Sequence, residues 1–372
     1  MATGIDIRGA LAARRVPLAF VALLSVSCGM WLGLVRLGWN LPLPWPDQLI
    51  AHGPLMVCGF LGTLISLERA VALGSRWGYA APVLVASGAL MLDLGPLGSL
   101  APAMITAGSL VMVAIFVVAW WRHALLSVAT MTIGALAWTT GNAQWLGGAP
   151  LFRVVFWWLA FLVLTIAGER LELNRVLRPA RDVLAEFVLA ISMILGGVGA
   201  ATWWPAPGIR VLGMGLIALS WWLVRHDVAR LTIRQHGVTR FMAVCLLGGY
   251  AWLGVGGIVA AVTGATMTGL PYDALLHSVF LGFVISMVFA HAPEIVPTVV
   301  GLPLPFRPAF YLHVGVLHVS LILRVAGDLV ESLGRWRAWG GVLNAAALLL
   351  FMFNTGCSMA LRGSRGNHGD PI

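Results

Sequence analysis

The chain has 372 residues, of which 60% are hydrophobic and only 10% are charged, and its mean hydropathy is +0.92. Soluble domains carry about 45–50% apolar and about 25% charged residues, so this composition excludes a water-soluble enzyme, a disordered regulator and a nucleic-acid-binding module. The net charge of +9 comes from arginines that lie mostly between apolar runs, where such charges contact lipid headgroups. The sequence therefore predicts an all-α polytopic membrane protein whose first partner is the lipid bilayer.

Twelve apolar runs are long enough to cross a membrane, which takes about 20 residues. Turns rich in proline and glycine separate several of them, as at 41–46, 205–208 and 301–305. No interval between runs can hold a further domain, so residues 1–372 are expected to form one helical bundle with terminal segments 1–16 and 362–372. The expected spans are 17–37, 50–73, 78–95, 100–121, 124–146, 152–170, 183–203, 208–225, 239–264, 274–298, 308–328 and 337–361.

The distribution of arginines between the runs predicts the orientation. With a cytoplasmic N-terminus, 17 of the 23 basic residues fall on the cytoplasmic side, 5 fall on the other side, and Arg324 lies within a span. Cytoplasmic loops carry an excess of Arg and Lys, and a wrong number of spans would scramble this asymmetry. Both termini are therefore expected in the cytoplasm.

A few ionisable residues lie inside the expected spans, where each costs at least about 2.5–3.5 kcal/mol and needs a partner or a function. Helical rise places them in two groups. His291, for example, follows His277 by fourteen residues, which puts it about 21 Å deeper on nearly the same face. The expected outer group is His52, His277, Arg324 and Asp328, and the expected inner group is His291, Glu294, His313 and His318.

Within each group, spacing along the helices predicts a contact. Arg324 and Asp328 are four residues apart on one helix, so they are expected to pair. His291 and His313 have matched depths on consecutive spans, so they are expected to approach each other.

Histidines on neighbouring helices are a common way to build haem and metal sites in a bundle. His52 and His277 are expected to be the axial ligands of a haem, and Arg324 to pair with a haem propionate or with Asp328. The inner histidines His291, His313 and His318 would form a second metal site, for which copper is a candidate, or a proton relay. For any single histidine, a structural hydrogen bond between helices is the alternative.

The two outer histidines are followed by similar short sequences. A Gly59-Phe60 pair follows His52, and a Gly282-Phe283 pair follows His277, with spacings that differ by two residues. This echo is a faint indication of two related halves. The two small glycines are also expected to let a flat macrocycle lie close to the backbone.

These stretches resemble the NnrS family. The resemblance rests on the span count, on His52 followed by Gly-Phe-Leu-Gly, on the His277 helix, on the loop 301–304 and on the stretch 321–325. NnrS-like proteins are described as haem- and copper-containing proteins of the bacterial inner membrane that are linked to nitric oxide metabolism. The resemblance implies a haem, of b type, and a small diatomic or redox ligand, and its site positions carry over to His52, His277 and Arg324. The chain departs from the family pattern at 291–297 and 67–71.

Two other functions remain open from the sequence. Twelve spans and embedded charges also fit a secondary transporter without a cofactor. An assembly factor for a larger haem–copper oxidase would share the haem and associate with a larger membrane complex. Turnover, sensing and sequestration of the ligand would all use the same haem.

Overall fold

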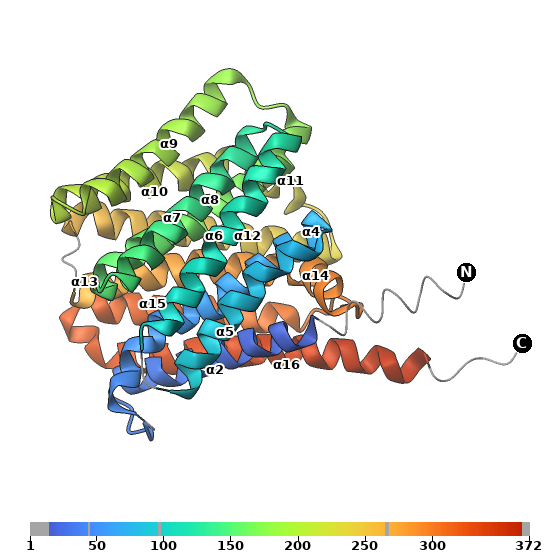
Figure 1. Ribbon diagram of the computed structural model, residues 1–372. Coiled ribbons are helices and arrows are strands. Elements are labelled where there is room, and N and C mark those ends of the chain that lie inside the picture. Colours follow the sequence, from blue (N-terminus) through green and yellow to red (C-terminus); the bar gives the residue numbers. More distant parts are fainter. Residues whose placement is uncertain (1–14, 44, 96–97, 265–267, 367–372) are drawn as a thin grey trace, which may run out of the picture.

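The computed structural model describes residues 15–43, 45–95, 98–264 and 268–366, and within them the chain is helical, with no strand. The helices lie side by side and run between two ends of the molecule, marked by α13 and α11 in Figure 1. The first half contains α2 (Val16–Arg36), η1 (Pro46–Ala51), α3 (His52–Pro54), η2 (Leu55–Gly62), α4 (Thr63–Leu73), η3 (Arg76–Tyr79), α5 (Ala80–Leu94), α6 (Leu100–Arg122), α7 (Leu126–Leu146) and α8 (Leu151–Leu173). The second half contains η4 (Asn174–Leu177), α9 (Arg181–Ala200), α10 (Pro205–His226), α11 (Ala229–Thr232), α12 (Gly237–Thr263), α13 (Leu270–His277), η5 (Ser278–Ile285), α14 (Ser286–Val300), α15 (Phe310–Leu329), η6 (Glu331–Leu333) and α16 (Gly334–Gly366).

Eleven of these helical stretches are long and apolar enough to cross a membrane, and α7 is a twelfth of similar length. The mean hydropathy of α7 is lowered by polar residues such as Asn142, which is buried and accepts a hydrogen bond from Trp158 Nε1 at 2.9 Å. The twelve expected spans therefore all appear as helices in the described part of the chain. The protein is an all-α, multi-pass membrane protein.

Local sequence explains where the helices begin and end. Proline occupies the first turn of α10 and α13, where its missing N–H costs no intrahelical hydrogen bond. The helices α4, α12 and α14 end at Gly74, Gly264 and Gly301, whose positive φ angles of 69°, 64° and 78° favour glycine.

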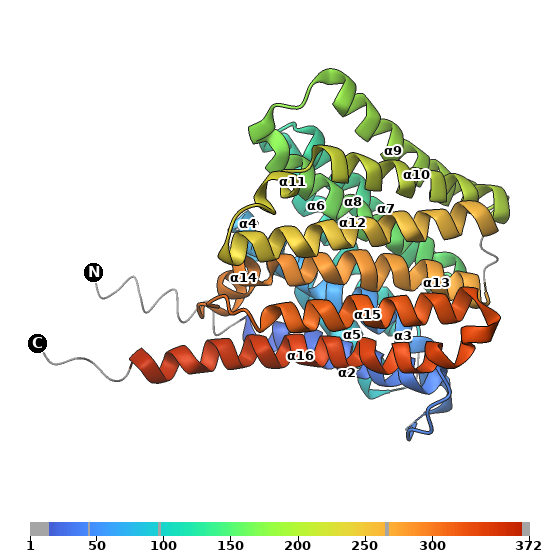
Figure 2. The same cartoon turned by 180° about the vertical axis from the view of Figure 1, so that it is seen from behind.

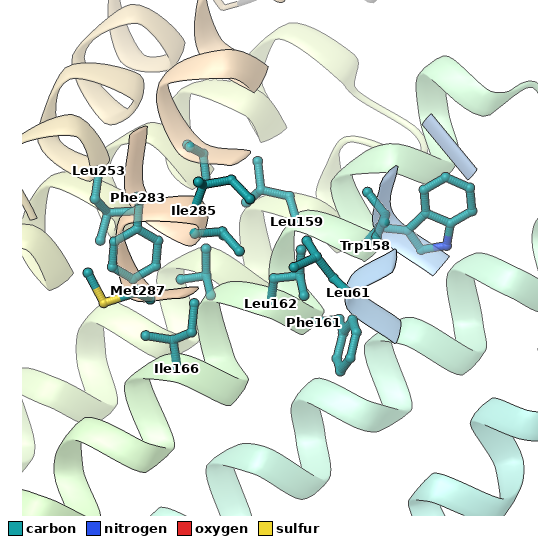
Figure 3. Close-up of a cluster of buried hydrophobic side chains, with 14 of the residues drawn as sticks. Leu61, Trp158, Leu159, Phe161, Leu162, Ile166, Leu253, Phe283, Ile285 and Met287 are labelled. Carbon is teal, nitrogen blue, oxygen red and sulfur yellow. The ribbon is translucent and has the colours of Figure 1, made fainter. Parts of the chain in front are cut away.

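The arrangement of the helices places three spans inside the bundle. In Figure 2, α10, α12, α14, α15 and α16 lie in a row, and successive members of this row are in contact directly or through α13 and η5. Among the spans identified by hydropathy, the most enclosed are α8 and the two composite spans that run through η2 and η5. These three spans and α12 meet in the apolar cluster of Figure 3, to which they contribute Leu61, Leu162, Leu253 and Phe283.

Candidate functional site

A cavity of about 870 Å³ opens at the α13 end of the bundle. Its walls come from the end of α2, the start of the composite span that contains η2, the start of α8, and parts of α13, η5, α15 and α16. Leu61, Trp158 and Ile285 belong both to the cavity lining and to the cluster in Figure 3, so the apolar core forms part of the cavity wall. Its size falls in the range of about 300–1,000 Å³ that is typical of cofactor and ligand sites.

His52 and His277 both line this cavity, as the sequence predicted for one site. His52 Nδ1 lies 2.7 Å from the carbonyl oxygen of Gly29, and His277 Nδ1 lies 2.9 Å from that of Asp273. A carbonyl can only accept a hydrogen bond, so each Nδ1 carries a proton, and in the neutral form of the ring the lone pair is then on Nε2. Neither Nε2 has a hydrogen-bond partner among the described residues. Metal-binding histidines are commonly held in this way.

The backbone around His52 and His277 is unusual. The ring of His52 packs against Gly33 of α2, where an added Cβ would lie 2.9 Å from His52 Cε1. Each histidine is followed within three residues by a π-helical segment, η2 or η5, each eight residues long. Such segments are rare and occur frequently at functional sites, because the inserted residue re-aims the side chains.

Arg324 lines the same cavity, but its partner differs from the expected one. Its Nη2 and Nε lie 2.8 and 3.2 Å from Asp273 Oδ2, whereas the nearest basic group to Asp328 is Arg337, 3.9 Å away. The predicted Arg324–Asp328 pair is therefore wrong. Four-residue spacing allowed the pair, but Asp273 on the neighbouring helix α13 offers a closer carboxylate.

Asp273 is a site residue that the sequence analysis missed. Its Oδ1 lies 3.3 Å from His277 Nδ1 and its Oδ2 binds Arg324, so one carboxylate orients the histidine and the arginine together. It precedes the expected span 274–298 by one residue and was therefore not counted among the embedded groups. A carboxylate four residues before a histidine on one helix was the available signal.

The expected inner histidines do not form one site in the structure. His291 Nδ1 lies 2.8 Å from the carbonyl oxygen of Met287, and its Nε2 lies 3.5 Å from Arg170. His318 Nδ1 accepts a hydrogen bond from Trp252 at 3.0 Å. None of the three inner histidines lines the cavity.

His313 has a different environment again. Its Nδ1 lies 3.3 Å from Asn354 Nδ2, and its ring lies among those of Phe241, Phe289, Phe310 and Phe351. Among the described residues, His313 makes no hydrogen bond or ring contact with His291. Across the described ranges, no three His, Cys, Asp or Glu side chains lie close enough together to share a metal ion, at this level or in the cavity.

Gly59 and Gly282 also have a different role from the expected one. An added Cβ at Gly59 would lie 2.8 Å from Ser25, and one at Gly282 would lie 2.4 Å from Trp252. Both glycines therefore admit side chains from neighbouring helices, and neither lines the cavity. The structure therefore gives no support to the expectation that a macrocycle lies against them.

The cavity thus combines three chemical properties. Most of its lining is apolar, two imidazoles present Nε2 atoms that have no hydrogen-bond partner among the described residues, and the described lining includes three arginines but a single aspartate. This combination suits a flat, apolar, anionic group that carries a metal, because imidazole is the usual axial ligand of haem and arginine matches carboxylates.

Comparison with known proteins identifies the family of the chain. No curated protein matches the sequence. The model of a family described as a domain of unknown function (DUF8744) matches residues 15–360 and so covers nearly all the described helices. The chain belongs to this family.

Proposed function

We propose that the protein binds a b-type haem in the cavity at the α13 end, with His52 and His277 as its axial ligands, and that through it the protein binds nitric oxide or a related small redox ligand. One observation carries the proposal: two histidines in one cavity have Nδ1 bound to a backbone carbonyl and Nε2 without a partner in the described structure. A bound haem would supply an iron centre that exchanges electrons and that could bind a diatomic ligand where one of the two histidines leaves the iron.

The residues of the chain have separate tasks in this proposal. Asp273 and the Gly29 carbonyl keep the two imidazoles in the tautomer that binds iron. The apolar lining excludes water from the macrocycle. The NnrS resemblance supports nitric oxide as the ligand. His291, His313 and His318 are left out of the proposed site, because none of them lines the cavity.

The location follows from the same resemblance and from the arginine distribution. We propose that the protein lies in the bacterial inner membrane with the α11 end in the cytoplasm, which would open the cavity to the periplasmic side. An assembly role within a larger membrane complex would use the same haem site.

A secondary transporter without a cofactor is a second candidate, favoured by one specific observation. The two spans that carry His52 and His277 are both interrupted by π-helical segments beside the cavity. Transporters bind substrates where paired helices are discontinuous.

The absorption spectrum of the purified protein tests the proposal. We expect a Soret band with sharp reduced α and β bands, which His52→Ala and His277→Ala should each abolish or convert to a high-spin form. His318→Ala is the matched control, because its ring binds Trp252 and does not line the cavity. A full spectrum in both cavity variants would refute the axial assignment. A protein that stays colourless after haem is added would favour the transporter.

A further inference from the structure

The mouth of the cavity carries more positive than negative charge. Arg36, Arg324 and Arg337 all line it, whereas Asp273 is the one acidic residue among the described lining residues. Two donor atoms of Arg324 already bind Asp273 Oδ2. Arg324 is therefore committed to orienting Asp273, and the anion-binding capacity of the mouth lies in the other two arginines.

Arg36 and Arg337 have no strong partner. Arg36, the last residue of α2, is exposed and makes no hydrogen bond or ion pair within the described structure. Arg337 Nε lies 3.9 Å from Asp328 Oδ1, which is beyond the usual hydrogen-bond range of about 2.7–3.2 Å. Both carboxylate oxygens of Asp328 are buried and have no hydrogen-bond partner in the described part of the chain. The donors of Arg337 are therefore not engaged by Asp328.

Close packing of α15 and α16 fixes the backbone of Arg337 against Gly327, three residues after Arg324 on α15. An added Cβ at Gly327 would lie 2.7 Å from the backbone nitrogen of Arg337, and one at Gly340 would lie 2.7 Å from that of Arg324. The two helices can approach this closely only because these positions are glycines. Arg337 also lines a second hollow of about 580 Å³, together with Asp328 and Glu331, so it contributes to the walls of both hollows.

We propose that Arg36 and Arg337 bind the two carboxylates of a flat apolar ligand in the cavity, and that Arg324 does not. The inference rests on the proposed function, because a porphyrin with two propionates is the ligand class that it describes. In this inference, Arg36 of α2 and Arg337 of α16 make the site selective. They favour a dicarboxylate over an uncharged molecule of the same shape. Planar guanidinium groups suit this task, since each can donate two parallel hydrogen bonds to a carboxylate.

Metal-free protoporphyrin IX and its dimethyl ester test this inference without using the histidines or iron. Binding of each to the purified full-length protein can be measured by porphyrin fluorescence. We expect the wild type to bind the diacid at least about 10-fold more tightly than the ester, because a hydrogen bond between charged groups is worth about a factor of 10 or more. The preference should narrow as the salt concentration rises, because Arg36 is exposed.

Two variants and a matched control test whether Arg36 and Arg337 cause the preference for the diacid over the ester. Arg36→Gln and Arg337→Gln should each weaken binding of the diacid about 10-fold and leave binding of the ester unchanged, which also shows that the cavity remains folded. Arg335→Gln changes an exposed arginine on the same helix that does not line the cavity, and it should have no effect.

The outcomes separate this inference from the proposed function. Equal binding of the diacid and the ester by the wild type, or no binding of either, would overturn the inference, as would a preference that both variants retain. A low-spin haem spectrum alongside such a result would leave the proposed function standing. A clear preference for the diacid in a protein that gives no low-spin haem spectrum would refute the axial ligands and support the two arginines.

Discussion

Asp227→Ala should lower the free energy of unfolding by about 3–5 kcal/mol, because it leaves the buried guanidinium of Arg170 without a counter-charge. The side chains of Arg170 and Asp227 are 2% and 0% exposed, and two hydrogen bonds of 2.8 Å join them. Asp227 also accepts hydrogen bonds from the backbone N–H of Ala229 at 2.7 Å and from Asn174 at 3.4 Å. The substitution therefore removes every one of these acceptors at once.

An exposed ion pair provides the matched control. Arg175 and Glu172 lie 2.7 Å apart, but their side chains are 56% and 39% exposed, so Arg175→Ala should cost only about 0–1 kcal/mol. Unfolding in mixed micelles can be followed by the fluorescence of the 17 tryptophans. Replacing both members of the buried pair, as in Arg170→Leu with Asp227→Leu, should recover much of the loss, because no unpaired charge remains.

Equal losses for Asp227→Ala and Arg175→Ala would refute this reasoning. So would a double variant that is less stable than Asp227→Ala alone, since the cost would then come from lost packing or lost hydrogen bonds rather than from an unpaired charge.

Two further predictions concern the site and the orientation. Gly33→Ala should weaken retention of haem, because the added Cβ would lie 2.9 Å from His52 Cε1. Gly196→Ala on α9 should not, because no atom lies within 4 Å of its Cβ and it does not line the cavity; equal spectra would contradict this placement of the ring. A reporter that is active only in the periplasm should be silent when it is fused after Gly369, which lies outside the described residues. The same reporter should be active when it is fused after Thr202, between α9 and α10. Strong activity after Gly369 would mean an odd number of spans.

The fold could be predicted because the length of an apolar run is a direct physical requirement of the bilayer. The expected spans 100–121 and 152–170 correspond to α6 (Leu100–Arg122) and α8 (Leu151–Leu173). Even α7 was found, although its polar residues lower its hydropathy, because the connections on both sides leave room for one helix.

Depth along a helix could also be predicted, but rotation about the helix axis could not. His52, His277 and Arg324 reach one cavity because they lie at similar heights. His291 was placed near the face of His277 by assuming about 100° per residue. The intervening segment η5 is π-helical over Ser278–Ile285, so the rotation per residue changes and the assumption fails. His291 instead contacts Arg170.

A related reason explains why the sequence did not predict three residues of the cavity, Arg36, Asp273 and Arg337. All three lie within a residue or so of the edge of an expected span, where an arginine is explained by the orientation of the chain and an aspartate by exposure to water. In the structure, the ends of these spans line the cavity, because α2, α13 and α16 all contribute to its wall. No single-helix pattern contains that information.

The similarity between the sequences that follow His52 and His277 has a structural explanation, which the different spacings from each histidine to its Gly-Phe pair do not reveal. The π-helical segments both have eight residues, and the Gly-Phe pair occupies the fifth and sixth positions of each. A buried hydroxyl residue, Thr63 or Ser286, follows each segment directly. The two-residue difference therefore lies entirely between the histidine and the start of its segment: η2 begins three residues after His52, and η5 begins one residue after His277. The repeated unit is therefore the π-helical segment together with the hydroxyl residue that follows it, and the histidine precedes this unit by a different number of residues in each span.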